Sequence, residues 1–102
     1  MKIALTVKGA GLGAWLDDSF AKCNQVMIVE DNNRFTDWLN PFRDDVNAPT
    51  LLADAIIKEN VDVLITSQIS AEAASKISIA GINLVTKNGG TVFDLIDEVR
   101  GE

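Results

Sequence analysis

The chain has 102 residues, 47% of them hydrophobic and only two of them proline, so we expect one compact domain over residues 1–102. A formal net charge of −6 argues against nucleic acid, whose binding needs clustered lysine and arginine. One cysteine cannot form an internal disulfide, and the apolar run at 2–7 is too short for a signal peptide or a membrane helix. We therefore expect a cytoplasmic protein that binds neither nucleic acid nor membranes.

The aliphatic and β-branched run at 2–7 predicts a buried first strand, which ends at a glycine cluster. Glycines directly after a buried strand let the backbone approach a ligand closely, because they lack Cβ and can adopt positive φ. The segment 8–23, which joins this strand to the next apolar run, is therefore the first place to look for an anionic ligand. Histidine is absent, which removes the commonest general base and metal ligand.

Residues 25–31 and 34–40 read as two strands, and the turn chemistry of Asp31-Asn32-Asn33 between them predicts a hairpin. Asn40-Pro41 ends the hairpin, and residues 42–46 read as a charged loop.

A helix is expected to open at Asn47 or Thr50, with Pro49 in its first turn, and to close at 58–60. Its predicted apolar face is formed by Leu51, Leu52, Ala55 and Ile56.

Strand and helix then alternate to the end of the chain. Ser70 is the expected N-cap of a second helix and Gly81 its C′ residue, while Thr91-x-x-Asp94 resembles a capping box for a third. The expected elements are a strand at 61–66, a helix at 71–80, a strand at 82–86 and a helix at 92–100. This order predicts an α/β protein whose sheet has a parallel portion covered by helices on both faces.

The chain resembles the dinitrogenase iron-molybdenum cofactor biosynthesis family, which includes NifX-like and NafY-like carriers and the orange proteins of sulfate reducers. The resemblance covers nearly the whole chain and lies in the order and spacing of short motifs. These are Met1 to Leu12 with Gly9 and Gly11, Leu16-Asp17-x-x-Phe20-x-x-Cys23, Ala53 to Thr66, Ala80-Gly81-Ile82 and Gly89-Gly90-Thr91-Val92.

The resemblance implies a ribonuclease-H-like three-layer α/β/α fold, with a five-stranded mixed sheet in the order 3-2-1-4-5 and strand 2 antiparallel. It also implies a non-enzymatic role, carrying a metal-sulfur cluster of the iron-molybdenum or molybdenum-copper sulfide type. A cluster-assembly or acceptor protein is the implied partner. Larger residues stand at three positions where the family has glycine: at Ala21, within 43–47 and within 66–70.

In that strand order, strands 1 and 4 form a topological switch point, and three loops should converge at their carboxyl ends. Two of these loops run into helix N-termini, which offer N–H groups and partial positive charge to an anion. We expect the cluster to dock there, held by lysines, glycines and polar loop residues. The candidate residues are Lys8, Gly9, Gly11, Phe20, Lys22, Cys23, Ser67, Gln68, Ser70, Lys87, Gly89 and Gly90.

Cys23 has two competing interpretations. A thiolate beside Lys22 would have a lowered pKa and could be a soft ligand for the metal, whereas a single cysteine entering a strand is often a small buried hydrophobic residue. One thiol cannot form a zinc or iron-sulfur site by itself.

Three other functions compete with that of a cluster carrier. Gly9-x-Gly11-x-x-Ala14 also fits a dinucleotide-binding fingerprint, with Leu12, Trp15, Leu16, Phe20 and Cys23 at helical spacing, but a hairpin follows where a crossover helix is needed. A two-metal nuclease is disfavoured, because the first strand carries no carboxylate. The remaining alternative is a family member that has lost the cluster and acts as a protein interaction module.

Overall fold

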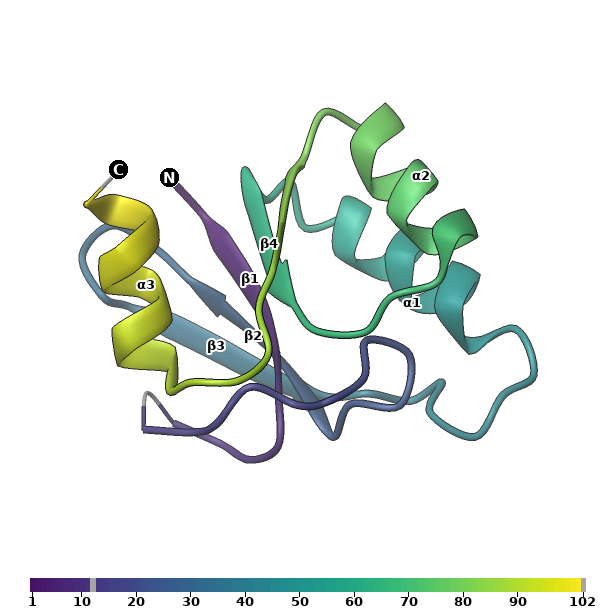
Figure 1. Ribbon diagram of the computed structural model, residues 1–102, viewed down its shortest axis with the longest axis horizontal. Coiled ribbons are helices and arrows are strands. Elements are labelled where there is room, and N and C mark those ends of the chain that lie inside the picture. Colours follow the sequence, from purple (N-terminus) through teal and green to yellow (C-terminus); the bar gives the residue numbers. More distant parts are fainter. Residues whose placement is uncertain (12, 102) are drawn as a thin grey trace.

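A computed structural model of the protein describes residues 1–11 and 13–101. Its elements follow the predicted order of three strands, a helix, and then strand and helix in alternation (Figure 1). They are β1 (Ile3–Val7), β2 (Gln25–Val29), β3 (Phe35–Leu39), α1 (Ala48–Ile57), β4 (Val63–Thr66), α2 (Ala71–Ile79), β5 (Asn83–Thr86) and α3 (Val92–Arg100).

The five strands form one sheet in the order β3-β2-β1-β4-β5, as expected. β2 pairs antiparallel with β1 and β3, whereas β1, β4 and β5 pair in parallel. All five residues of β1 are buried, because the strand lies in the middle of the sheet and both of its faces are covered.

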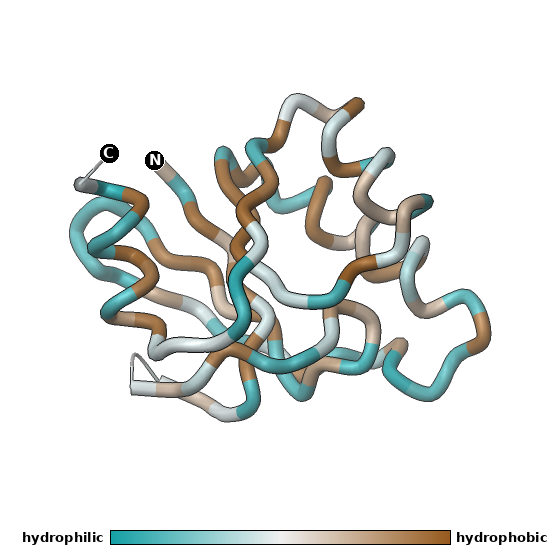
Figure 2. The backbone as a smooth tube through the Cα atoms, in the orientation of Figure 1, coloured by the Kyte–Doolittle hydropathy of each residue, from teal (hydrophilic) through white to brown (hydrophobic). Residues whose placement is uncertain are grey.

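Helices cover both faces of the sheet, which gives the expected three layers. In Figure 1, α1 and α2 lie together on one side of the strands and α3 lies on the other. One core packs beneath α1 and α2 around Ala4, Leu52 and Leu64, and the second packs beneath α3 around Leu5 and Leu95. In Figure 2, hydrophobic residues run along the strands and hydrophilic residues are frequent in the outer loops.

The helix ends confirm most of the capping predictions. Ser70 Oγ accepts a hydrogen bond from the Ala73 N–H at 3.2 Å, and Thr91 Oγ1 accepts one from the Asp94 N–H at 3.3 Å. Gly81 follows α2 with a φ of +83°. Many helices end in this left-handed conformation, which glycine adopts without steric cost.

The helix α1 begins after Asn47 and carries a proline in its first turn, as predicted. Its buried face differs in detail from the expected one, because Ala48, Leu52, Ala53 and Ile56 are buried while Leu51 and Ala55 are half-buried.

Candidate functional site

The segment after β1 does not form a helix. Residues 14–20, which we call the strap, run across the carboxyl ends of the central strands and make isolated bridges rather than helical turns (Figure 1). Leu16 pairs with Val7, Trp15 with Thr91, and Ser19 with Gln68. The helix required by a dinucleotide fingerprint is therefore absent from the strap; Leu12, part of that pattern, lies outside the described residues.

The strap is hydrogen-bonded to two other loops, the one that follows β4 and the one that follows β5. The Phe20 N–H donates to the Gln68 carbonyl at 2.8 Å, and the Leu16 N–H donates to the Gly90 carbonyl at 2.9 Å. The Val92 N–H, the first of α3, donates to the Ala14 carbonyl at 2.9 Å. These contacts come from the strap, which follows the loop 8–13 that was expected to meet the other two loops. The strap also uses part of the hydrogen-bonding capacity of the α3 N-terminus.

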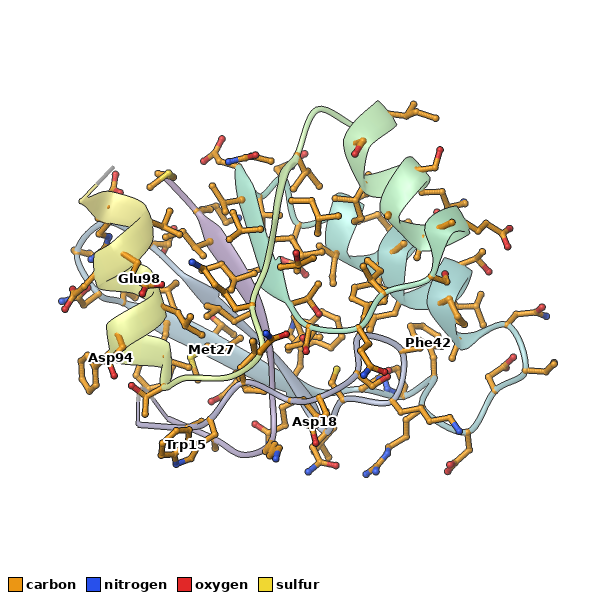
Figure 3. The ribbon with its side chains drawn as sticks, in the orientation of Figure 1. Trp15, Asp18, Met27, Phe42, Asp94 and Glu98 are labelled. Atoms are coloured by element: carbon orange, nitrogen blue, oxygen red, sulfur yellow. The ribbon has the colours of Figure 1, made fainter. Side chains whose placement is uncertain are left out.

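The strap also closes the expected crevice between β1 and β4. The Asp17 N–H donates to the Thr6 carbonyl at 2.9 Å, and the buried side chains of Phe20 and Leu16 pack beneath the strap. In Figure 3, Trp15 projects outward beneath the first turn of α3, and Asp18 lies further along the strap.

An open depression lies one strand further along the sheet, between the loops that follow β4 and β5. We call it the β4–β5 hollow. Its volume is about 560 Å³, and it is lined by Ser67, Gln68, Ile69, Thr86, Lys87 and Asn88. Its lining offers hydroxyl, amide and ammonium groups, which suit an anion held by hydrogen bonds and one positive charge.

Three of the predicted residues, Ser67, Gln68 and Lys87, meet in this hollow. Thr86 and Asn88 were missed in the sequence, although both flank Lys87 at the end of a predicted strand. Ser70, Gly89 and Gly90 belong to the same two loops, and Gly90 has a structural need for glycine. Its φ is +119°, and a Cβ there would stand 3.3 Å from Leu95 Cδ2.

The three predicted lysines do not form one cluster. Lys87 Nζ lies 3.2 Å from Glu98 Oε2 on α3, and Lys8 Nζ lies 3.6 Å from Asp18 Oδ2 on the strap. Lys22 is exposed and lines a different depression, together with Arg43 and Asp45. Of these three lysines, Lys87 is the one that lines the β4–β5 hollow, and its ammonium is paired with Glu98.

The remaining predicted residues lie elsewhere. Phe20 has no exposed surface and packs in the core beneath α1 and α2. Gly9 and Gly11 belong to the loop that leaves β1, and the Gly11 N–H donates to Asp37 Oδ2 of β3 at 3.1 Å.

The Cys23 thiol is fully buried in the same core as Phe20. Burial, followed by the nearby charge of Asp17, raises the pKa of the Cys23 thiol from 9.0 to about 12. Asn40 Nδ2 donates to Cys23 Sγ at 3.6 Å and to the Cys23 carbonyl at 3.1 Å. This environment favours the interpretation of Cys23 as a protonated core residue.

Within residues 1–11 and 13–101, no three carboxylate or thiol side chains are arranged to hold a metal ion. Among the described residues, no helix is long and apolar enough to cross a membrane.

Comparisons with known proteins agree with this architecture. The family model described as "Dinitrogenase iron-molybdenum cofactor" matches residues 1–101. The apo form of the orange protein from Desulfovibrio gigas is 23% identical with a TM-score of 0.87, over 98% of this chain and 88% of that one. A Thermotoga protein of the DUF35 family, described as a NifB protein, is 22% identical with a TM-score of 0.83, over 98% and 87%. No curated protein sequence matches the chain.

Proposed function

Because the chain belongs to the dinitrogenase iron-molybdenum cofactor family, we propose that it carries a metal-sulfur cluster as cargo and catalyses no reaction. The proposed cargo is an iron-molybdenum cofactor precursor or a molybdenum-copper sulfide, both of which are anionic. The protein would act as one domain in the cytoplasm, where its single thiol stays reduced. A cluster-assembly or acceptor protein would be its partner.

The observation that carries this proposal is the β4–β5 hollow with Lys87 at its wall. Thiomolybdate anions present sulfur acceptors on all sides, and the hollow is lined by residues whose side chains can donate hydrogen bonds. The hollow lies beside the N-terminus of α2, which adds partial positive charge. Ser67, Gln68 and Lys87 would contact the cluster, while Ser70, Gly89 and Gly90 would shape the loops around it. Lys8 and Lys22 would act only at longer range.

The proposed docking does not use Cys23 as a ligand. The Cys23 side chain has no exposed surface and packs in the core beneath α1 and α2, so a cluster docked in the β4–β5 hollow would not contact its sulfur. Phe20 and Cys23 would support the strap from below, and Gly9 and Gly11 would turn the chain into it.

Anaerobic reconstitution tests the proposal. The protein is incubated with tetrathiomolybdate plus copper, and separately with an iron-molybdenum cofactor donor, and is then desalted and analysed for metal and visible absorption. We expect molybdenum to be retained near one cluster per chain. Lys87→Gln should lower retention several-fold, and higher salt should also lower it, because the attraction is electrostatic. Cys23→Ser should retain metal as the wild type does.

Lys58→Gln is the matched control. It removes the same charge from an exposed residue at the C-terminus of α1, which does not line the β4–β5 hollow. A colourless wild-type protein without retained metal after desalting would rule out the carrier function. Loss of metal in Cys23→Ser alone would instead support thiolate ligation.

A second candidate is a family member that has lost the cluster and binds other proteins. The exposure of two aromatic side chains favours it, since Trp15 is 60% and Phe93 54% exposed near the same loops. The reconstitution distinguishes the two candidates, because an interaction module retains no metal.

A further inference from the structure

β3 is an edge strand, and its outer side carries backbone groups that the sheet does not use. At the two ends of the β2–β3 ladder, the Arg34 carbonyl accepts a hydrogen bond at 2.9 Å and the Asn40 N–H donates one at 3.0 Å. Hydrogen-bonded positions alternate along an antiparallel pair, so the even-numbered residues of β3 face β2. The N–H and C=O groups of Phe35, Asp37 and Leu39 therefore point outward, and no other described residue bonds to them.

An apolar groove, which we call the α1 groove, lies beside this edge on the face of the sheet that α1 covers. Its volume is about 490 Å³. Its lining comes from β3, the loop after β3 and α1, and consists of Trp38, Pro41, Phe42, Leu51, Asp54, Ala55, Lys58 and Glu59. The indole N–H of Trp38 is buried and has no acceptor among the described residues. The groove wall therefore contains a polar group that this part of the chain leaves unpaired.

The edge and the α1 groove together fit an extended segment. A strand added to a sheet edge bonds through its backbone and places alternate side chains on opposite faces of the sheet. Side chains set opposite Thr36 and Trp38 would lie on the groove face, because Trp38 packs against the core beneath α1. Side chains set opposite Phe35, Asp37 and Leu39 would lie on the other face, where Phe35 is 41% and Leu39 72% exposed.

Charge decides which segment fits. Asp37 is the charged residue of β3 and lies midway between the two exposed apolar side chains. A cation directly opposite Asp37 would strengthen the pairing, whereas an anion there would weaken it. The net charge of −6 adds attraction for a basic partner at longer range. A second copy of this chain is disfavoured for the same reasons, because it would set like charges against each other.

We propose that β3 accepts an extended segment of another protein as a further, antiparallel strand. The segment carries a lysine or arginine opposite Asp37 and, next to it, an apolar residue opposite Trp38 whose side chain enters the α1 groove. This inference is independent of the proposed cluster-carrying function, since β3 lies at one edge of the sheet and the β4–β5 hollow at the other.

Titration with a synthetic peptide tests the pairing. The probe is acetyl-Ser-Val-Leu-Lys-Thr-Val-Ser-amide, which in antiparallel register sets its lysine opposite Asp37 and its leucine opposite Trp38. In isotope-labelled protein followed by NMR, we expect the amides of Phe35, Asp37 and Leu39 to shift and to exchange more slowly with solvent. Glutamate in place of the peptide's lysine should weaken binding several-fold. Methylation of that lysine's backbone nitrogen should abolish binding, because it removes a donor to the edge.

Variants of the protein test the two contacts separately. Asp37→Asn keeps a side-chain acceptor for the Gly11 N–H but removes the charge, so it should weaken binding of the lysine peptide and strengthen that of the glutamate peptide. Glu72→Gln, at an exposed position of α2, is the matched control and should change both affinities much less. Ala55→Leu fills part of the α1 groove and should remove the advantage of leucine over alanine at the position opposite Trp38.

Several outcomes would overturn the proposal. These are no binding at millimolar peptide, equal binding of the methylated peptide, and amide shifts along β5, the other edge strand, instead of β3. Shifts of the β3 amides that depend on protein concentration without any peptide would show that a second copy occupies the edge instead.

Discussion

The hydroxyl oxygens of Thr6 and Thr66 lie 2.6 Å apart, fully buried at the carboxyl ends of the neighbouring strands β1 and β4. Each hydroxyl is the hydrogen-bond partner of the other. The Thr6 carbonyl meanwhile accepts the Asp17 N–H of the strap, and the Thr66 carbonyl accepts the Lys87 N–H, each at 2.9 Å. This pair therefore stands between the strap on one side and the β4–β5 hollow on the other.

Replacing one threonine of the pair should lower the free energy of unfolding more than replacing both. Thr66→Val leaves the Thr6 hydroxyl buried without its partner, which typically costs about 1–3 kcal/mol. The double variant Thr6→Val/Thr66→Val removes both polar groups at nearly constant volume and should recover most of that loss. Urea denaturation of the wild type, both single variants and the double variant measures the coupling. Additive losses would show that the two hydroxyls do not depend on each other.

Gly90 should not tolerate a side chain, whereas Gly13 should. Gly90→Ala combines a φ of +119° with a Cβ 3.3 Å from Leu95 Cδ2, so we expect the free energy of unfolding to fall by about 1–3 kcal/mol. Gly13 directly precedes the strap, and a Cβ there would meet no atom within 4 Å. Thermal unfolding of the two alanine variants compares them directly, and equal losses would contradict the steric explanation.

Cys23 should make the free energy of unfolding depend on alkaline pH. Its pKa is raised from 9.0 to about 12 in the folded protein, so the folded state keeps the proton while the unfolded state releases it. The resulting stability is fully present below pH 9 and is lost as pH rises from 9 toward 12, with a slope of up to about 1.4 kcal/mol per pH unit. Urea denaturation of the wild type and Cys23→Ala between pH 8 and pH 10.5 tests this, because the variant should lack that slope.

The same burial predicts that Cys23 is unreactive in the folded protein. Alkylation by iodoacetamide at neutral pH should be slow in buffer and fast in denaturant, since the thiol is inaccessible and protonated. Rapid alkylation of the native protein would contradict the buried position and reopen the thiolate-ligand interpretation.

Glu98 should weaken cluster retention, because its carboxylate lies 3.2 Å from Lys87 Nζ. Glu98→Gln frees the Lys87 charge for an anion in the β4–β5 hollow, and we expect retained molybdenum to increase after the reconstitution described above. An exposed ion pair contributes little to folding, so stability should change by less than about 1 kcal/mol. Asp97→Asn on the same helix removes equal charge as a control. If both variants retain metal equally well, the effect comes from overall charge and not from this pair.

The order of elements could be predicted from the sequence because local chemistry decides it. Ser70 and Thr91 cap helices by bonds that span three residues, Gly81 ends one by its own conformation, and the apolar runs around Ile3 and Leu64 are buried strands. The sheet order followed from the family resemblance, and the pairing of β2 between β1 and β3 agrees with it.

Which part of the loop cluster is open and which is closed could not be predicted in the same way. The glycines of 8–13 indicated a loop, but whether the strap would stand open above β1 and β4 or close over them depends on hydrogen bonds to Gln68 and Gly90, far away in the chain. The side chains of Lys8 and Lys87 likewise reach partners that local sequence does not reveal.

The sequence by itself determined which segments are strands and helices, where the helices begin, and which loops carry the polar residues, because those properties depend on neighbours a few residues apart. Only the tertiary structure decided that Phe20 and Cys23 belong to the core, that the strap closes the β1–β4 end, and that the opening lies between β4 and β5. The physical reason is that burial and access depend on which distant segments pack together. The strap that follows the glycines is therefore a cover over the ends of β1 and β4, and the open hollow lies beside it.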